Sequence, residues 1–442
     1  MSAMTRHSPD RFDGSDGSDG SVCGSGWRTT WVLLAFMLVN FADKTVLGLA
    51  ATPIMDDLGL TREQFGTASA VFFALFSVSA LAVSSLTRTV RTTVLLLAMA
   101  LLWSAAQLPM LWTAAGFGTL VATRVLLGAA EGPALPVATH HLHGWFEQRE
   151  RTLPTAVLLT GAAAGVAVAA PTLTLVIDHL GWRWAFGAVG LAGLAWAAYW
   201  ALRGAEGPYA CRAGEGGTAQ DAVPYRRILL SGTWISAALG AFAAYWMLSA
   251  NLTWMPDYLE SVTGLSLHQA GLLVTGAALA NGVVLVGHGL LAQRRPQPAN
   301  GPGTGALMCL AAVAVGLFAL TDTVWLKVLL MLGPMALANV IMTVAQTACA
   351  RIAPASQRGV VLGALAFVYA LAGALAPWVV GRVVDAADSV DAGYRTAFLF
   401  TSALLGLSGL LALRFLRPER DARRLATHWA TRLATNQGRQ PS

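Results

Sequence analysis

Apolar runs of about 20 residues recur along most of the chain, and this is the length that an α-helix needs to cross roughly 30 Å of hydrocarbon. The composition agrees, because 55% of the residues are hydrophobic, 12% are charged and the mean hydropathy is +0.58. Backbone groups in hydrocarbon must be satisfied within their own segment, so each run is expected to be helical. The expected spans are approximately 29–51, 64–86, 92–112, 114–139, 153–177, 183–203, 229–256, 268–292, 304–321, 324–349, 359–380 and 395–416.

The polar segment 204–228 separates these spans into two sets of six. We therefore predict an all-α integral membrane protein with twelve helices in two six-helix bundles, 28–203 and 229–416. Segment 204–228 is the expected cytoplasmic linker, and 417–442 is a basic cytoplasmic tail. Segment 1–27, which repeats Asp-Gly-Ser over 13–21, is expected to be a disordered cytoplasmic tail without a signal peptide. Two bundles of six are typical of transporters that rock around a midplane site.

The positions of the basic residues predict the orientation. With both termini in the cytoplasm, the loops on that side carry twelve arginines, against five basic residues on the other side. The expected location is the cell inner membrane, with multiple passes. The pI of about 9.4 then reflects topology and contact with anionic lipid, and no nucleic-acid partner is expected.

Four ionisable side chains interrupt the first and fourth expected spans: Asp43, Lys44, Arg124 and Glu131. A charge at bilayer depth costs roughly 2.5–3.5 kcal/mol even on lenient scales, so such residues persist where they pair or line a watery path. Arg124 and Glu131 are seven residues apart, about 10 Å along one helix face, and can serve separate roles. The four charges indicate an ion-coupled transport site, and simple helix–helix pairing is the alternative.

Several motifs resemble a known family. Asn40-Phe-Ala-Asp-Lys44 is similar to the Asn-Tyr-x-Asp-Arg signature of the anion:cation symporters, a branch of the major facilitator superfamily that includes sugar-acid and vesicular glutamate transporters. Further segments are similar to that branch in order and spacing. They are Arg124-Val-Leu-Leu-Gly-Ala-Ala-Glu-Gly-Pro-Ala-Leu-Pro136, Trp145-Phe-Glu-Gln-Arg-Glu-Arg151, Gly181-Trp-Arg-Trp-Ala-Phe186 and Trp254-Met-Pro-Asp-Tyr-Leu259. The resemblance extends over about 30–416.

The resemblance implies roles for the four charges. Asp43 and Glu131 correspond to the protonation sites of the sugar-acid transporters, and Lys44 and Arg124 to positions that handle the substrate anion. Glu131 has no basic neighbour within a turn of its own helix, which favours it as the proton carrier. Lys44 replaces the usual Arg, and it is expected either to contact the substrate or to act as the counter-ion of Asp43.

The departures from the family pattern concern gating and substrate polarity. Of the usual Gly-x-x-x-Asp-Arg-x-Gly-Arg-Arg loop only Arg88 remains, so the network that latches the cytoplasmic face is expected to be weaker. Polar positions of relatives are replaced by apolar residues, which are Phe41, Leu75, Ala163, Ala366 and Ala370. A site without these hydroxyls and amides would leave the hydroxyls of a sugar acid unpartnered. A monoanion with a more apolar body is therefore expected.

No expected span of the second half carries a central charge. The residues expected to complete the substrate cavity there, with helix packing as the alternative, are Tyr245, Trp246, Asn251, Asn281, Asn339, Gln346 and Tyr369. Tyr369 stands where relatives have a small residue, and an aromatic ring there would shrink the cavity or stack on the substrate.

Other classes of function lack support in the sequence. No Gly-x-x-x-x-Gly-Lys-Ser/Thr loop or nucleophile–base set is present, so no enzyme activity and no cofactor are expected. His140, His141 and His143 do not share one helix face, and no metal site is expected.

The sequence therefore predicts a monomeric secondary transporter that moves a small organic anion, a monocarboxylate, together with protons by alternating access. Symport is the favoured mode. A proton-antiport exporter of an amphipathic metabolite and a non-transporting sensor on the same fold are the alternatives.

Overall fold

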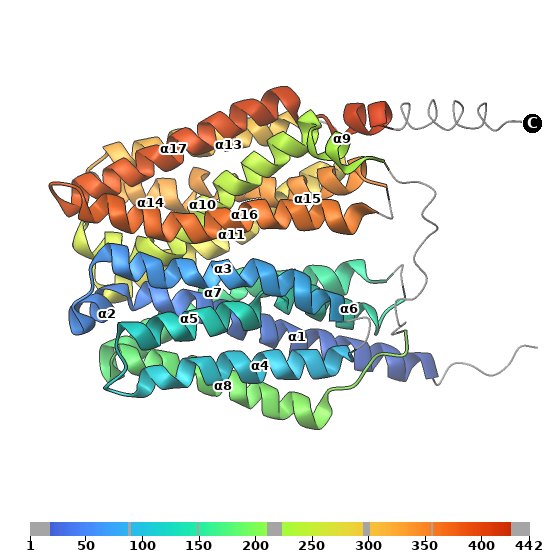
Figure 1. The fold of residues 1–442 in the computed structure, drawn as a ribbon, viewed down its shortest axis with the longest axis horizontal. Helices are drawn as coiled ribbons and strands as arrows, with labels where there is room; N and C mark the ends of the chain where they lie inside the picture. Colours follow the sequence, from blue (N-terminus) through green and yellow to red (C-terminus); the bar gives the residue numbers. More distant parts are fainter. Residues whose placement is uncertain are drawn as a thin grey trace, which may run out of the picture.

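The computed structural model describes residues 18–86, 90–147, 150–209, 223–294, 301–354 and 357–425. Within these residues the chain is helical, with loops and short 3-10 segments as connections and no strand. Figure 1 shows two layers of long helices that run in the same general direction. The N-terminal half forms one layer and the C-terminal half forms the other, as the two-bundle prediction requires.

The N-terminal bundle is formed by the first half of the described chain. Its elements are α1 (Ser18–Leu49), α2 (Ala51–Leu58), α3 (Arg62–Leu86), α4 (Thr92–Gln107), η1 (Leu108–Leu111), α5 (Phe117–Glu131), α6 (Ala134–His143), α7 (Thr152–Leu180) and α8 (Trp182–Arg203). The short helix α2 lies at the end of the molecule that we call the α2 end (Figure 1). The opposite end, where α1 begins and α17 ends, we call the termini end (Figure 1).

The C-terminal bundle begins after the connecting segment. Its elements are α9 (Tyr225–Leu229), α10 (Gly232–Ser261), α11 (Leu267–Arg294), α13 (Pro302–Leu320), α14 (Val324–Leu332), η3 (Pro334–Asn339), α15 (Val340–Ile352), α16 (Arg358–Asp385) and α17 (Val390–Phe415).

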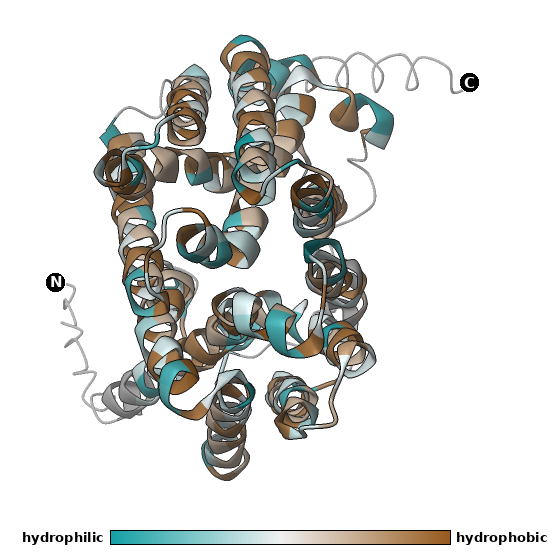
Figure 2. Cartoon of the chain, turned by 90° about the vertical axis from the view of Figure 1, so that its left-hand side faces the viewer, coloured by the Kyte–Doolittle hydropathy of each residue, from teal (hydrophilic) through white to brown (hydrophobic). Residues whose placement is uncertain are grey.

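Eleven stretches of the described residues are long and apolar enough to cross a membrane, and α3 occupies the remaining expected span. Large apolar side chains remain exposed on the outside of the bundles, among them Leu202 (82% exposed) and Val283 (73%). Hydrophobic residues occur around the whole circumference when the molecule is viewed from the α2 end (Figure 2). Surfaces of this kind are stable in contact with lipid tails, which confirms the predicted class of integral membrane protein.

Two of the expected spans are broken at the same kind of dipeptide. Gly132-Pro133 separates α5 from α6, and Gly333-Pro334 separates α14 from η3. Proline has no backbone N–H and clashes with the preceding turn, so a continuous helix is disfavoured at both places. The break places Glu131 at the C-terminal end of α5. Matching breaks in the fourth span of each half are typical of transporters built from structural repeats.

Two of the departures from the expected helix bounds concern the polar tail and a buried charge. Helix α1 begins at Ser18, within the segment expected to be disordered, whereas residues 1–17 lie outside the described part of the chain. Helix α10 continues to Ser261, beyond the expected end at residue 256, and so includes Asp257. Asp257 is fully buried. This buried charge lies near the end of α10 and not at its centre, and it was missed because the expected span stopped one residue before it.

The two bundles meet tightly at the α2 end. Gly48 of α1 lies directly against the backbone of Leu252 in α10, where a Cβ atom would collide. Beside this contact, Ser69 Oγ and Thr253 Oγ1 are 2.9 Å apart.

Charged residues reinforce this closure, and we call Arg62, Glu63, Asp257, Arg382 and Asp385 the α2-end latch. Arg62 Nε donates to Asp257 Oδ2 at 2.9 Å, and Arg382 Nη1 donates to Glu63 Oε1 at 3.2 Å. The carboxylate of Asp385 accepts from the backbone N–H groups of Arg62 (3.2 Å) and Glu63 (2.6 Å). Helix α3 of one bundle is thereby held to α10 and α16 of the other.

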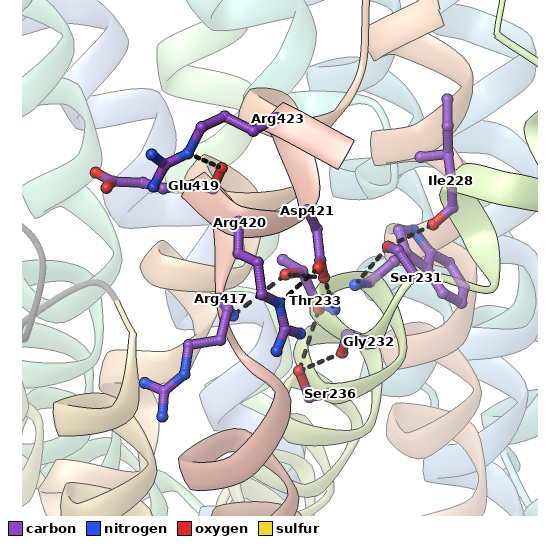
Figure 3. A network of polar contacts seen from close by, with 11 residues as sticks. Ile228, Ser231, Gly232, Thr233, Ser236, Arg417, Glu419, Arg420, Asp421 and Arg423 are labelled. Carbon is purple, nitrogen blue, oxygen red and sulfur yellow. Dashed lines mark hydrogen bonds and ion pairs between the residues drawn. The ribbon is translucent and has the colours of Figure 1, made fainter. Parts of the chain in front are cut away.

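At the termini end, the segment after α17 is attached to the start of α10 (Figure 3). Asp421 Oδ2 accepts from the backbone N–H of Thr233 at 2.9 Å and from its hydroxyl at 2.7 Å, and Arg420 Nε donates to Asp421 Oδ1 at 3.1 Å. Partial burial raises the pKa of Asp421, but these hydrogen bonds outweigh it and the pKa lies below its ordinary value. The carboxylate also sits at a helix N-terminus, where negative charge is favoured.

Candidate functional site

The four charges predicted from the sequence come together between α1 and α5. Asp43, Arg124 and Glu131 are at most 1% exposed, and the side chain of Lys44 is 9% exposed. Two uncharged residues, Asn40 of α1 and Gln107 at the end of α4, join them through hydrogen bonds. We call these six residues the charged cluster.

Lys44 is paired with Glu131. Its Nζ atom donates to Glu131 Oε2 across the α1–α5 interface, and also to Asn40 Oδ1 at 2.6 Å. The basic neighbour that Glu131 lacks on its own helix is therefore supplied by α1. Consecutive residues of a helix point about 100° apart, which explains why Lys44 faces Glu131 while Asp43 faces elsewhere. Among the described residues Lys44 forms its ion pair with Glu131 and not with Asp43, and its role toward the substrate stays a prediction.

Asp43 is connected to Arg124 through Gln107. Gln107 Nε2 donates to Asp43 Oδ1, and Gln107 Oε1 accepts from Arg124 Nη2 at 2.6 Å. Gln107 was not among the residues predicted from the sequence. The signal was present, however, because an amide in the third expected span must find partners inside the bundle.

Aromatic rings surround both cations of the cluster. Lys44 Nζ lies 4.9 Å from the ring centre of Phe41 and 5.7 Å from those of Phe72 and Phe76. Arg124 Cζ lies 5.1 Å from the ring centre of Phe186. The faces of aromatic rings attract cations and exclude water, which strengthens the electrostatic interactions inside the cluster.

Several polar atoms of the cluster are buried without a hydrogen-bond partner. They are Asn40 Nδ2, Asp43 Oδ2, Arg124 Nε and Glu131 Oε1. A cavity of about 20 Å³ adjoins Asp43, Lys44 and Arg124. This volume suits a water-sized group and is far too small for an organic anion.

A much larger cavity of about 370 Å³ lies beside the cluster, and we call it the methionine cavity. Its walls come from both bundles and carry no charged side chain. The polar lining consists of Asn251, Asn281, Asn339 and Thr343, and Asn281 Oδ1 is buried without a partner. Five methionines line it: Met247, Met255, Met331, Met335 and Met342. Methionine adapts to irregular shapes and contacts aromatic rings favourably, so this cavity suits an apolar or aromatic body with few polar groups.

The predicted cavity residues divide into two groups. Asn251, Asn281 and Asn339 line the methionine cavity, and so does Phe41. Trp246 does not line it, because its Nε1 donates to Thr401 Oγ1 at 3.2 Å and its ring packs 5.2 Å from Phe400 on α17. The prediction that Trp246 contacts substrate is not supported by its position in this packed interface.

Three further predicted residues also lie outside the cavity lining. Tyr245 and Tyr369 pack against each other with ring centres 5.0 Å apart, and Tyr245 also contacts Phe73 at 5.9 Å. Gln346 is exposed on α15, one turn beyond Met342 toward the termini end. Arg88, the predicted gating residue, lies outside the described residues.

Two of the apolar replacements noted in the sequence, Phe41 and Ala163, are cavity residues. Leu75 is 36% exposed, and Ala366 and Ala370 are not part of the lining. The apolar character of the cavity therefore rests mainly on methionine and alanine residues that the sequence analysis did not identify.

Phe41 and Leu252 separate the methionine cavity from the charged cluster. Leu252 lines both cavities, and the Phe41 ring lies between the large cavity and Lys44 Nζ. Gly165 of α7 fixes Phe41 in place, because a Cβ atom there would lie 2.8 Å from the Phe41 Cβ. Lys44 and Arg124 therefore do not line the large cavity in this conformation.

A second polar group lies at the termini end. Glu206, which follows α8, accepts from the Thr93 N–H at 2.8 Å and from the Thr92 hydroxyl at 2.8 Å. Partial burial raises the pKa of Glu206, but the hydrogen bonds from Thr93 and Thr92 and the nearby His141 lower it below its ordinary value. His141 Nδ1 lies 2.7 Å from Thr92 Oγ1, so this histidine takes part in the same network. In the described part of the chain no three His, Cys, Asp or Glu residues group as a metal site would require.

Two six-helix bundles enclosing a midplane cavity, with paired charges between spans, define a secondary transporter. The chain belongs to the Major Facilitator Superfamily, whose family model matches residues 32–377 and 237–437.

Relatives support the resemblance to the anion:cation symporter branch. The chain is 26% identical to a D-galactonate transporter of Escherichia coli over 59% of its length and 66% of that protein. It is 27% identical to a probable sulfoacetate transporter of Cupriavidus necator over 57% of its length and 61% of that protein. Both alignments span less than two thirds of the relative. A hexuronate transporter of Bacillus subtilis is 24% identical over 88% of this chain and 94% of that protein.

Solved structures confirm the fold. A bacterial homologue of the human lysosomal transporter Spinster, in an inward-facing and unoccupied conformation, superimposes with a TM-score of 0.75 at 19% identity, covering 92% of this chain and 99% of that one. A D-xylose–proton symporter gives 0.72 at 15% identity, covering 89% and 98%. At these identities the likeness concerns the fold alone.

Proposed function

We propose that this chain is a proton-coupled secondary transporter of a small organic anion with one carboxylate and an apolar body. The observation that carries the proposal is the charged cluster, in which two acids and two bases are buried between α1, α4 and α5. Keeping such charges inside a membrane protein is costly, and ion pathways are where they commonly persist. The relatives named as galactonate, hexuronate and sulfoacetate transporters support an anionic substrate.

The roles follow from the pairing. Glu131 releases Lys44 when it takes up a proton, because a neutral carboxyl holds an ammonium far less strongly. Lys44 and Arg124 then provide positive charge for a carboxylate that enters from the methionine cavity. Asp43 is the second proton-coupling residue, and Phe41 and Asn251 contact the substrate body.

The same proposal includes an orientation. We place both termini in the cytoplasm of a cell with this chain in its cytoplasmic membrane, so that the α2 end faces outward and the described conformation is closed to the outside. Exposed arginines in the last turn of α17 and beyond it would then contact anionic lipid, and they include Arg414, Arg423 and Arg424. We further propose that the transporter acts as a monomer.

Uptake into reconstituted vesicles under an imposed pH gradient tests the proposal. Radiolabelled benzoate serves as the apolar-bodied monocarboxylate, and galactonate as the polyhydroxylated comparison. Glu131→Gln should abolish proton-driven accumulation of benzoate while counterflow exchange continues, because exchange needs binding and rocking but no proton release. Accumulation by the variant at the level of the parent would refute the assignment of Glu131 as proton carrier.

One observation favours a second candidate, an exporter that exchanges protons for an amphipathic metabolite. The methionine cavity has no charged lining and is closed off from Lys44 by Phe41. An exporter would bind uncharged apolar compounds in competition with benzoate. It would also move protons in the direction opposite to its substrate, so that substrate uptake would raise the pH inside the vesicles, whereas symport would lower it. The direction of proton movement, read with a pH-sensitive dye inside the vesicles, separates the two functions.

A further inference from the structure

Gln107 is the structural link between an acid and a base that do not touch each other. It is the last residue of α4 and is completely buried. Its amide nitrogen donates to Asp43 Oδ1 and its amide oxygen accepts from Arg124 Nη2. The reverse orientation of the amide would place oxygen against carboxylate and nitrogen against guanidinium, so the two neighbours dictate its direction.

We propose that Gln107 is a positioning residue that couples the charge of Asp43 to the availability of Arg124 for an anion. The inference rests on the proposed function, because it assumes that Asp43 gains and loses a proton during transport. Neither the sequence motifs nor the family resemblance assigned a role to this residue.

The amide has little freedom to abandon either partner. Gly190 of α8 packs against the base of the Gln107 side chain, so closely that a Cβ atom at Gly190 would lie 3.3 Å from the Gln107 Cβ. Phe186 of the same helix covers the guanidinium of Arg124. Helix α8 therefore holds Gln107 and Arg124 against α1 without contributing a charge of its own.

The charged groups around the amide come from two helices. The amide contacts Asp43 of α1 and Arg124 of α5, and the other charges that act on Asp43 are Lys44 of α1 and Glu131 of α5. Because Lys44 is engaged by Glu131, the donor seen on Asp43 is Gln107. An ionised Asp43 holds the amide by a charge-assisted hydrogen bond and, through it, partly offsets the positive charge of Arg124.

Protonation of Asp43 changes both ends of this link. The hydrogen bond from Gln107 then ends on a neutral carboxyl and weakens. The negative charge of Asp43, which had partly offset the charge of Arg124 through the Gln107 amide, is lost. Arg124 consequently attracts a carboxylate more strongly. Proton uptake therefore strengthens anion binding, which is the coupling that symport requires.

The first experiment measures Asp43 directly and needs no ligand. Infrared difference spectra of the purified full chain report the C=O stretch of protonated Asp43, identified by its loss in Asp43→Asn. Gln107→Met is similar in length but offers no hydrogen bond, and it should move the titration midpoint of this band at least one pH unit toward alkaline pH, a tenfold change in proton affinity. Gln107→Glu keeps an acceptor for Arg124 but loses the donor to Asp43. It should also move the titration midpoint of the Asp43 band toward alkaline pH.

Leu101→Met is the matched control, since it introduces methionine on an exposed face of the same helix. It should leave the midpoint unchanged. If Gln107→Met does not fold, Gln107→Glu decides alone. Midpoints within 0.3 pH unit of the parent in the folded Gln107 variants would overturn the proposal.

The second experiment measures benzoate binding by calorimetry at pH 5.5 and 7.5. The parent and Leu101→Met should bind at least fivefold more tightly at the lower pH, and Gln107→Met should differ less than twofold between the two. A parental pH dependence in Gln107→Met would overturn the proposal. Failure of the parent to bind benzoate at either pH would count against the proposed substrate class, and the infrared measurement would still decide the role of Gln107.

Discussion

Removing Lys44 tests how the buried ion pair is held, because the structure gives it a single acidic partner. Lys44→Met keeps the length of the side chain and leaves the carboxylate of Glu131, whose side chain is fully buried, without its cation. Breaking a buried pair from one side costs about 3–5 kcal/mol, since the remaining charge is desolvated and uncompensated. We expect a loss of that size in the free energy of unfolding, measured by chemical denaturation in mixed micelles at pH 7.5.

The double variant Lys44→Met, Glu131→Gln should recover most of this loss. The pair of neutral residues leaves no buried charge behind, and such replacements are often close to neutral. The double variant should therefore lie within about 1–2 kcal/mol of the parent, which implies a coupling energy of at least about 2 kcal/mol between the two sites.

Lys327→Met is a matched control because Lys327 is the other lysine of the chain and is also buried. Its hydrogen bond goes to the hydroxyl of Tyr258 and not to a carboxylate. Its removal should cost only about 1 kcal/mol, the net value of one hydrogen bond. Additive effects of Lys44→Met and Glu131→Gln, or an equal cost for the two lysines, would refute the argument that Glu131 is the stabilising partner.

Three further predictions concern the α2-end latch, the termini end and the ligand. Asp257→Asn removes the carboxylate that Arg62 holds in the α2-end latch, so the α2 end should open more often. A cysteine at position 251 in a cysteine-free background should then be labelled several-fold faster from that side. Asp388 is exposed, and Asp388→Asn should have no effect. The pKa of Glu206 is lowered in the folded chain, so its contribution to stability is present at neutral pH and is lost as the pH falls below 4.5. The difference in Tm between the parent and Glu206→Gln should therefore shrink as the pH falls over that range. Benzoate should bind at least tenfold more tightly than galactonate, about 1.4 kcal/mol, and Ala163→Gln should narrow the gap in competition assays by supplying an amide to the sugar hydroxyls.

The sequence was sufficient to predict the helices and the charged residues, because both depend on local properties. Apolar length identifies a span, and an ionisable residue inside a span is visible without knowing its neighbours. The partners of those residues were not predictable, because they depend on how α1 is rotated relative to α5. A rotation of one residue would exchange the partners of Asp43 and Lys44.

Other features were present in the sequence but were not recognised. The Gly-Pro pairs at 132–133 and 333–334 indicate helix breaks, and Asp257 follows a proline at the end of a span. The methionine cavity, in contrast, gathers residues from α10, α14, η3 and α15, so no single segment reveals it. The neighbours of Trp246, Tyr245 and Tyr369 were not predictable for the same reason, since each ring packs against a residue from another helix.

Helix α10 connects every part of the proposed transport cycle. Near the α2 end it carries Asp257 of the latch, and three residues earlier in the chain Trp254 packs beneath it, donating to the carbonyl of Pro377 at 2.9 Å. Two residues before Trp254, Leu252 separates the methionine cavity from the small cavity at Asp43 and Lys44. Leu252 also packs against Gly48. The residue that separates the methionine cavity from the charged cluster therefore belongs to the contact that closes the α2 end. We infer that an anion can reach Lys44 only as α1 and α10 move apart, which makes release of the latch and engagement of the charged cluster one event.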